Sequence, residues 1–151
     1  MRLREFQSEL WLPLPPAELF PFFADAANLD AITPQWLHFQ IVTPPPIVMR
    51  EGTLIDYRLR VRGVPFRWRT LIKDWQPAHR FVDEQLRGPY RQWIHTHTFE
   101  PRDGGTLARD VVQYAVPFDF IAHPLFVRRD IETIFAFRQE ALRQRFGGTV
   151  M

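Results

Sequence analysis

The residues best suited to chemistry are two histidines, His95 and His97, in the segment GPYRQWIHTHTFE that spans residues 88–100. Alternate residues of a β-strand point to the same face, so both imidazoles would share a face with Trp93 and Phe99. A strand that faces an ordinary core carries aliphatic side chains there. Because imidazole is polar and titrates near neutral pH, this face predicts a lined cavity rather than a dry core.

A hairpin that follows this strand brings a carboxylate toward the histidines. If Asp103-Gly104 is the two-residue turn, His97 faces Asp110 on the next strand. If the turn lies one residue later, His97 faces Val112 instead. The sequence favours the first register, since it keeps the apolar residues of both strands on one face.

The histidines and Asp110 have three interpretations. They could form a polar network that satisfies its own hydrogen bonds, or they could orient a mostly apolar ligand. They could also perform acid–base catalysis, with His97 oriented by Asp110 as general base on a proton next to a carbonyl. Either His95 or Tyr114 would then polarise the carbonyl oxygen. Metal binding by the histidines and a carboxylate ranks lower because the spacing is not diagnostic, and we expect no metal or other cofactor.

The wider candidate site consists of side chains that strand alternation places on the same face as the histidines. A tight turn at Arg62-Gly63 keeps the aromatic residues of its two strands on that face. The strand that begins at Arg80 adds polar side chains with the same parity. We therefore predict a ligand-binding set made of Tyr57, Trp68, Thr70, Asp83, Gln85, Trp93, His95, His97, Phe99, Asp110, Val112 and Tyr114.

The elements that position these residues follow from the same periodicities. Strands are predicted over residues 2–12, 39–42, 53–61, 64–75, 80–86, 91–101 and 106–116, and short helices over 17–23 and 25–32. Over 124–146 the apolar period becomes 3.6, which predicts a long amphipathic helix ending at Gly147-Gly148. The arginines near its end, Arg138 among them, are expected to complement the helix dipole.

This order predicts one α+β domain over residues 1–151. An antiparallel sheet of six or seven strands must curl, and the long C-terminal helix is available to fill its concave side. Two short helices follow the first strand. A cavity remains wherever the helix does not fill the curve.

Composition narrows the class of protein. The 151 residues are 46% hydrophobic and 15% aromatic, with a formal net charge of +2 and no cysteine. A charge this small argues against a nucleic-acid partner, and the lack of cysteine excludes disulfides and makes the cytoplasm the expected location. The N-terminus has no signal-peptide pattern, and no stretch approaches the roughly 20 apolar residues that span a bilayer.

The segments NLDAITPQWLHFQIVTP, GTLIDYRLRVRGVPFRWRT, FVDEQLRGPYRQWIHTHTFE and IFAFRQEAL resemble those of the START/Bet v 1-like superfamily. This superfamily is also called SRPBCC, polyketide cyclase/dehydrase and lipid transport, and the likeness is to its small stand-alone bacterial proteins. It covers nearly the whole chain and implies the helix-grip fold, with a deep hydrophobic cavity between sheet and helix. Members carry lipids, sterols, quinones or plant hormones, and some are polyketide aromatase/cyclases. The resemblance implies a lining role for Trp93, His95, His97 and Phe99.

The leading hypothesis is therefore a protein that binds or carries a hydrophobic small molecule, either a lipid, an isoprenoid or quinone, or a polyketide-like compound. The alternative is a cyclase or dehydratase that uses His97 and Asp110 in the same cavity. A third hypothesis is a protein-interaction module that uses the rim of the cavity, which a large exposed apolar patch would favour.

Overall fold

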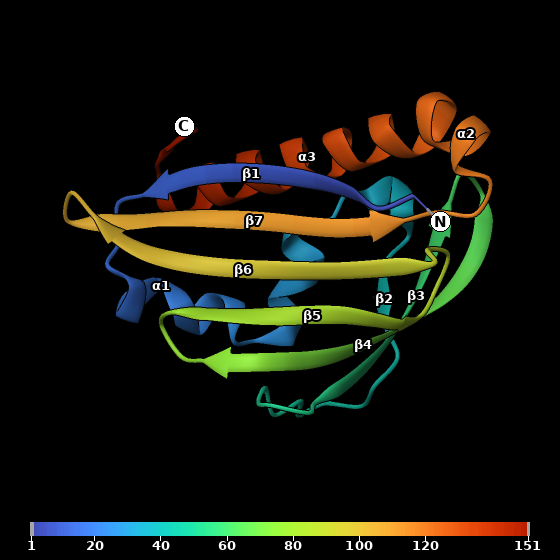
Figure 1. The fold of residues 1–151 in the computed structure, drawn as a ribbon. Helices are drawn as coiled ribbons and strands as arrows, with labels where there is room; N and C mark the ends of the chain where they lie inside the picture. Colours follow the sequence, from blue (N-terminus) through green and yellow to red (C-terminus); the bar gives the residue numbers. More distant parts are fainter. Residues whose placement is uncertain (1, 151) are drawn as a thin grey trace.

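The segments with alternating apolar residues form one antiparallel sheet that curves around the C-terminal helix (Figure 1). The computed structural model describes residues 2–150. The order of strands in the sheet is β2-β3-β4-β5-β6-β7-β1-β8. The strands are β1 (Arg4–Leu12), β2 (Gln40–Ile41), β3 (Leu54–Val61), β4 (Val64–Gln76), β5 (Arg80–Arg87), β6 (Gln92–Arg102), β7 (Gly105–Ala115) and β8 (Thr149–Val150).

Helices lie in two stretches of the chain. Between β1 and β2 come α1 (Pro16–Phe23) and the 3₁₀ helices η1 (Ala26–Ile32) and η2 (Gln35–Leu37). After β7 come α2 (Asp119–Ala122), the π-helical turn η3 (His123–Val127) and the long helix α3 (Arg128–Phe146). The predicted α+β helix-grip fold is confirmed, with β1 to β7 as the expected strands and β8 as a short addition. No helix within residues 2–150 is long and apolar enough to cross a bilayer.

Turn chemistry sets the register of the two central hairpins. Asp103 and Gly104 both have positive φ, at 50° and 76°, which is the backbone of a two-residue hairpin turn. The β6–β7 register therefore pairs His97 with Asp110, as predicted. Arg62 and Gly63 form the corresponding turn between β3 and β4, with φ of 50° and 80°.

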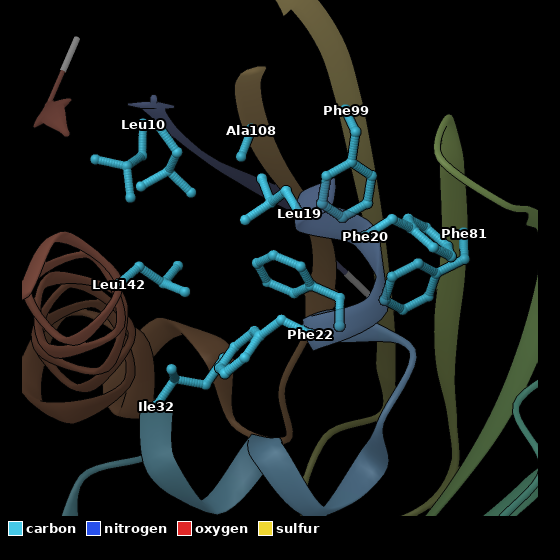
Figure 2. Close-up of a cluster of buried hydrophobic side chains, with 11 residues drawn as sticks. Leu10, Leu19, Phe20, Phe22, Ile32, Phe81, Phe99, Ala108 and Leu142 are labelled. Carbon is cyan, nitrogen blue, oxygen red and sulfur yellow. The ribbon is translucent and has the colours of Figure 1, made fainter. Parts of the chain in front are cut away.

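The core at one end of the sheet is built around α1. Pro16 begins this helix, and its four buried residues include Phe20 and Phe22. Figure 2 shows these side chains lying between the sheet residues Phe81 and Phe99 on one side and α3 on the other. The rings of Phe20 and Phe99 are 5.2 Å apart, edge to face. Burial of each such ring stabilises the fold by about 2 kcal/mol, so this end is a packed core.

Helix α3 packs on the part of the concave face formed by β1 and β7. Its buried residues Ile131 and Phe135 pack against Val112 and Tyr114 of β7. In Figure 1 the helix runs along β1 and β7, and β5 lies on the other side of β6 from these two strands. The space under β3 to β6 is therefore closed by η1 and by one side of α3 rather than filled by a helix.

The region before α3 differs from the predicted single helix over 124–146. The chain turns at Phe118, which adopts a left-handed conformation with φ of 54°, and α2 begins immediately after it. Pro124 is the second residue of the π-helical turn, and the regular helix begins four residues later. A proline cannot donate an amide hydrogen bond, so it disturbs the regular pattern there.

Candidate functional site

A cavity of about 210 Å³ lies between α3, η1 and the strands β3 to β6. Its walls are mostly aromatic and aliphatic, and they come from elements far apart in the sequence. Tyr57 and Trp68 lie on β3 and β4, Trp93 on β6, and Ile134 and Phe135 on α3. A mostly apolar lining with a few polar groups is typical of sites for small molecules.

Seven of the twelve residues predicted for the site line this cavity. They share the inward parity of strands β3 to β6, and they are Tyr57, Trp68, Thr70, Asp83, Trp93, His95 and His97. Strand alternation was sufficient to place them because these strands are not covered by α3.

The other five predicted residues do not line the cavity. Gln85 faces the β5–β6 connection, where its side-chain amide donates to the carbonyl of Tyr90 at 2.8 Å and accepts from its amide at 3.1 Å. Phe99 is buried against α1 in the packed core. Val112 lies under α3 and is fully buried.

Asp110 and Tyr114 lie on β7 and do not line the cavity for the same physical reason: α3 covers the inner face of this strand. The hydroxyl of Tyr114 is hydrogen-bonded to Nε2 of His123 at 2.7 Å, on the side of η3. Asp110 lies behind the histidines, where it supports them without facing the cavity. Parity gives the face of a sheet but does not tell which part of that face a helix will cover.

At one wall of the cavity five side chains form a buried polar cluster, made of Asp83, His95, His97, Asp110 and Arg138. The two imidazole rings stack with their centroids 3.7 Å apart. The closest hydrogen bonds cross the hairpin registers: His95 Nε2 lies 2.7 Å from Asp110, and His97 Nε2 lies 2.5 Å from Asp83. The predicted contact between His97 and Asp110 is present but longer, at 3.4 Å through Nδ1.

Arg138 is the member of the polar cluster that the sequence did not predict. It lies on the buried face of α3, and its side chain is only 8% exposed. One terminal nitrogen is 3.4 Å from the carboxylate of Asp110 and 3.4 Å from Nδ1 of His97. The earlier assignment of this arginine to the helix dipole was wrong. Its spacing from Ile131, Phe135 and Leu142 already placed it on the buried face.

A second feature of Arg138 bears on ligand binding. Its Nε is buried and has no hydrogen-bond partner among residues 2–150. Arg138 also lines the cavity. This Nε is enclosed by protein, so a hydrogen bond from Arg138 to a ligand oxygen would come from the part of its side chain that lines the cavity.

The charges around the polar cluster make His97 easier to protonate than His95. Burial penalises a charged histidine, but the hydrogen bonds of His97 to the two carboxylates outweigh this and raise its pKa. Burial and the neighbouring His97 lower the pKa of His95. Burial alone would raise the pKa of Asp83 and of Asp110, but the imidazoles and Arg138 hold both below their ordinary values. Two carboxylates are thus balanced by Arg138 and His97, with His95 neutral.

Three members of the polar cluster could offer ligand atoms to a metal. Those of Asp83, His95 and His97 lie within 4.8 Å of one another. However, His97 already uses Nε2 for its bond to Asp83, and the guanidinium of Arg138 contacts the same imidazole from the other side. The groups are arranged to satisfy one another rather than to surround a cation, so we assign no metal here.

Comparison with known proteins supports the fold. The family model described as polyketide cyclase/dehydrase and lipid transport matches residues 12–143. Protein CV1439 from Chromobacterium violaceum superposes with a TM-score of 0.73 at 15% identity, covering 95% of this chain and 98% of the other. The Zhui aromatase/cyclase from a Streptomyces species gives 0.71 at 12% identity, covering 95% and 93%.

A plant protein has the same fold. A major latex-like protein from Panax ginseng superposes with a TM-score of 0.69 at 7% identity, covering 95% of this chain and 97% of its own. Comparison with the sequences of curated proteins gave no significant match. The family model covers most of the chain, and the helix-grip architecture agrees with it. The chain therefore belongs to the polyketide cyclase/dehydrase and lipid transport family.

Proposed function

We propose that this protein binds one apolar small molecule in the cavity and holds an oxygen of that molecule at the polar cluster. The observation that carries this proposal is Arg138, a largely buried cation that lines the cavity beside the two stacked imidazoles. The ligand is a lipid, an isoprenoid or quinone, or a polyketide-like compound. The protein would store or carry this molecule.

The walls of the cavity support an apolar ligand with flat or branched parts. Trp68 and Trp93 meet edge to face with ring centroids 5.5 Å apart, and Tyr90 lies 4.8 Å from Trp93. Aromatic walls of this kind offer large contact areas without a polar partner that the ligand must match. A ligand made only of carbon and hydrogen would leave the polar cluster unused.

The polar cluster supports a carbonyl, carboxylate or hydroxyl oxygen at the inner end of the ligand. Arg138 donates from a fixed position because its guanidinium also contacts Asp110 and lies 5.5 Å from the ring of Phe23. Hydrogen bonds to a charged donor in a desolvated site contribute about 1.5–3 kcal/mol. Binding would therefore discriminate between an oxygen-bearing ligand and its hydrocarbon analogue.

A titration with anilinonaphthalene sulfonate, an aromatic probe that carries an anionic oxygen group, tests the proposal. We expect one saturable site, with affinity falling on the order of tenfold or more in Arg138→Met. Arg143→Met is the matched control, because that arginine lies exposed on the same helix and pairs with Glu140. Equal affinity in both variants, or no saturable binding by the wild type, would refute the proposed site.

The imidazole pair favours acid–base catalysis as a second candidate function. The carboxylate of Asp110 accepts a hydrogen bond from His95 Nε2, which leaves the lone pair of the neutral ring on Nδ1. His95 is therefore the better general base, whereas a protonated His97 suits the stabilisation of a developing oxyanion. In such a step His95 takes a proton from the carbon next to a ligand carbonyl, and the electron pair moves onto the carbonyl oxygen beside Arg138 and His97.

Hydrogen exchange distinguishes catalysis from binding alone. A bound ketone should acquire deuterium from D₂O at the carbon next to its carbonyl far faster with wild-type protein than without it. We expect His95→Gln to abolish this exchange while leaving affinity within about tenfold, or roughly 1.4 kcal/mol. Exchange no faster than in buffer would leave binding as the function and would reject the catalytic role.

A further inference from the structure

In the segment 118–126, between β7 and α3, large apolar side chains are exposed, whereas polar side chains contact the rest of the fold. Phe118, Phe120 and Leu125 are 73%, 77% and 59% exposed, and Ile121 and Phe126 are also exposed. None of the residues of α2 is buried. We call these five exposed side chains the apolar cap. Isolated exposed apolar residues are ordinary, but five within nine residues of the chain are a concentration that points to an interaction surface.

The polar residues of this segment point into the fold and fix its position. Asp119 accepts two hydrogen bonds from the guanidinium of Arg4, at 2.8 and 2.9 Å. His123 is buried and hydrogen-bonded to the hydroxyl of Tyr114 at 2.7 Å. The apolar cap is therefore presented outward by specific contacts, and it is not a loosely packed part of the core.

Arginines surround the apolar cap. Arg2, Arg4 and Arg128 line a shallow depression together with Phe120 and His123. The exposed Arg129 follows directly in the sequence. Arg128 has a partner in Glu132 at 3.3 Å, but this pair is largely exposed and so weakly coupled. Asp119 also lines this depression and pairs with Arg4, so the excess positive charge around the aromatic side chains comes mainly from Arg2 and Arg129. This charge complements an anionic partner.

The apolar cap adjoins the rim of the cavity. Arg62, in the β3–β4 turn, lies over the ring of Phe126 at 4.6 Å and donates two hydrogen bonds to Asp130 of α3. Asp130 itself lines the cavity, as does Val61 beside Arg62. Figure 1 shows α2 and the end of β3 on the same side of the molecule. A surface that covered the apolar cap would therefore lie next to the Arg62–Asp130 ion pair at the cavity edge.

We propose that the apolar cap and its arginines dock on the surface of an anionic lipid bilayer. Phe118, Phe120 and Leu125 would enter the boundary between headgroups and acyl chains, and Arg2, Arg128 and Arg129 would contact the phosphates. Aromatic and aliphatic side chains ringed by arginine are the composition of interfacial anchors, and the attraction to anionic lipid adds about 1 kcal/mol per basic residue near the surface. The protein lies on the membrane and does not span it.

Sedimentation with vesicles tests this docking, and it does not depend on what the cavity binds. We expect the wild type to bind vesicles of phosphatidylcholine that contain about one third phosphatidylglycerol, and to bind pure phosphatidylcholine at least about tenfold more weakly. F120D/L125D should lose about tenfold or more of the partition coefficient on the anionic vesicles, and Arg128→Gln/Arg129→Gln should abolish the preference for anionic lipid.

The matched control is V48D/L86D, which places the same charges at two exposed apolar positions on other elements. It should bind vesicles more strongly than F120D/L125D, and thermal melts should show all variants folded. Failure of the wild type to bind anionic vesicles, or equal loss in both aspartate pairs, would overturn the proposal. A wild-type dimer in light scattering that F120D/L125D converts to monomer would instead assign the apolar cap to self-association.

Discussion

Asp110 makes its shortest hydrogen bond, 2.7 Å, with His95, although it lies opposite His97 in the β6–β7 hairpin. Asp83 shows the converse relationship, since it lies opposite His95 but bonds most closely to His97. Each carboxylate thus contacts both rings, and the two stacked imidazoles are held as a unit. This crossed arrangement makes the protonation of one histidine depend on the other.

Removal of the negative charge of Asp110 should destabilise the fold strongly. In Asp110→Asn, Arg138 and His97 lose their shared carboxylate while remaining buried, and the free energy of unfolding should fall by about 3 kcal/mol. Urea denaturation measures this loss. Asp56→Asn is the control, because Asp56 pairs with Arg69 on the surface and should cost less than about 1 kcal/mol. Equal losses in the two variants would show that the polar cluster carries no special electrostatic weight.

The pKa values of the two histidines should be shifted in opposite directions from that of free imidazole. The pKa of His97 is raised by Asp83 and Asp110, which outweigh burial, whereas burial and the neighbouring His97 lower the pKa of His95. Nitrogen-detected NMR should therefore show a pH range around 6.5 in which His97 is protonated and His95 is neutral. Two titrations that both coincide with that of free histidine would contradict the assignment.

The same shifts give a pH dependence of stability. The contribution of His97 is fully present below its unfolded pKa near 6.5 and is lost as pH rises through its higher folded value. The carboxylates Asp83 and Asp110 have lowered pKa values, so they stabilise the fold above about pH 4 and lose this contribution as pH falls through their folded values. His95 favours the fold less as pH falls below 6.5, since the buried ring resists protonation. The urea midpoint of the wild type should therefore decrease as pH rises above about 6.5. In His97→Gln this decrease should be absent.

Filling the cavity should abolish binding without unfolding the protein. Ile134 is partly buried on α3 and faces the cavity, so Ile134→Trp places a larger ring in space that a ligand would need. Overpacking costs about 1–3 kcal/mol, which a melting curve will register. The neighbouring Thr133 is exposed, and Thr133→Trp is the matched control. Unchanged probe affinity in Ile134→Trp would place the bound molecule elsewhere.

The sequence predicted most of the fold but only the part of the cavity wall that strands β3 to β6 provide, and this difference has a physical cause. Local rules set the register of the β6–β7 hairpin, since Asp103-Gly104 suits a two-residue turn, and strand parity then oriented His95 and His97 correctly. Parity could not show that α3 would cover β7, so Val112 and Tyr114 were assigned to the cavity although they are packed under the helix. That outcome depends on how the whole sheet curves.

The buried position of Arg138 was also difficult to predict from the sequence. An arginine on an amphipathic helix is usually exposed, and only its spacing from Ile131 and Phe135 indicated the buried face. Its partner Asp110 lies on a strand 28 residues earlier in the chain. Arg138 helps to balance two buried carboxylates, Asp83 on the cavity wall and Asp110 behind it. Buried charges are paired across the fold, and such pairs leave little trace in local sequence patterns.

The most direct test of the proposed binding is native mass spectrometry of the purified protein, followed by solvent extraction and mass analysis of what is released. We expect a discrete, stoichiometric small molecule that carries at least one oxygen and is absent from Ile134→Trp prepared in the same way. Should the wild type bind neither a copurifying molecule nor any added oxygen-bearing apolar compound, the central claim of a ligand held at Arg138 would be contradicted.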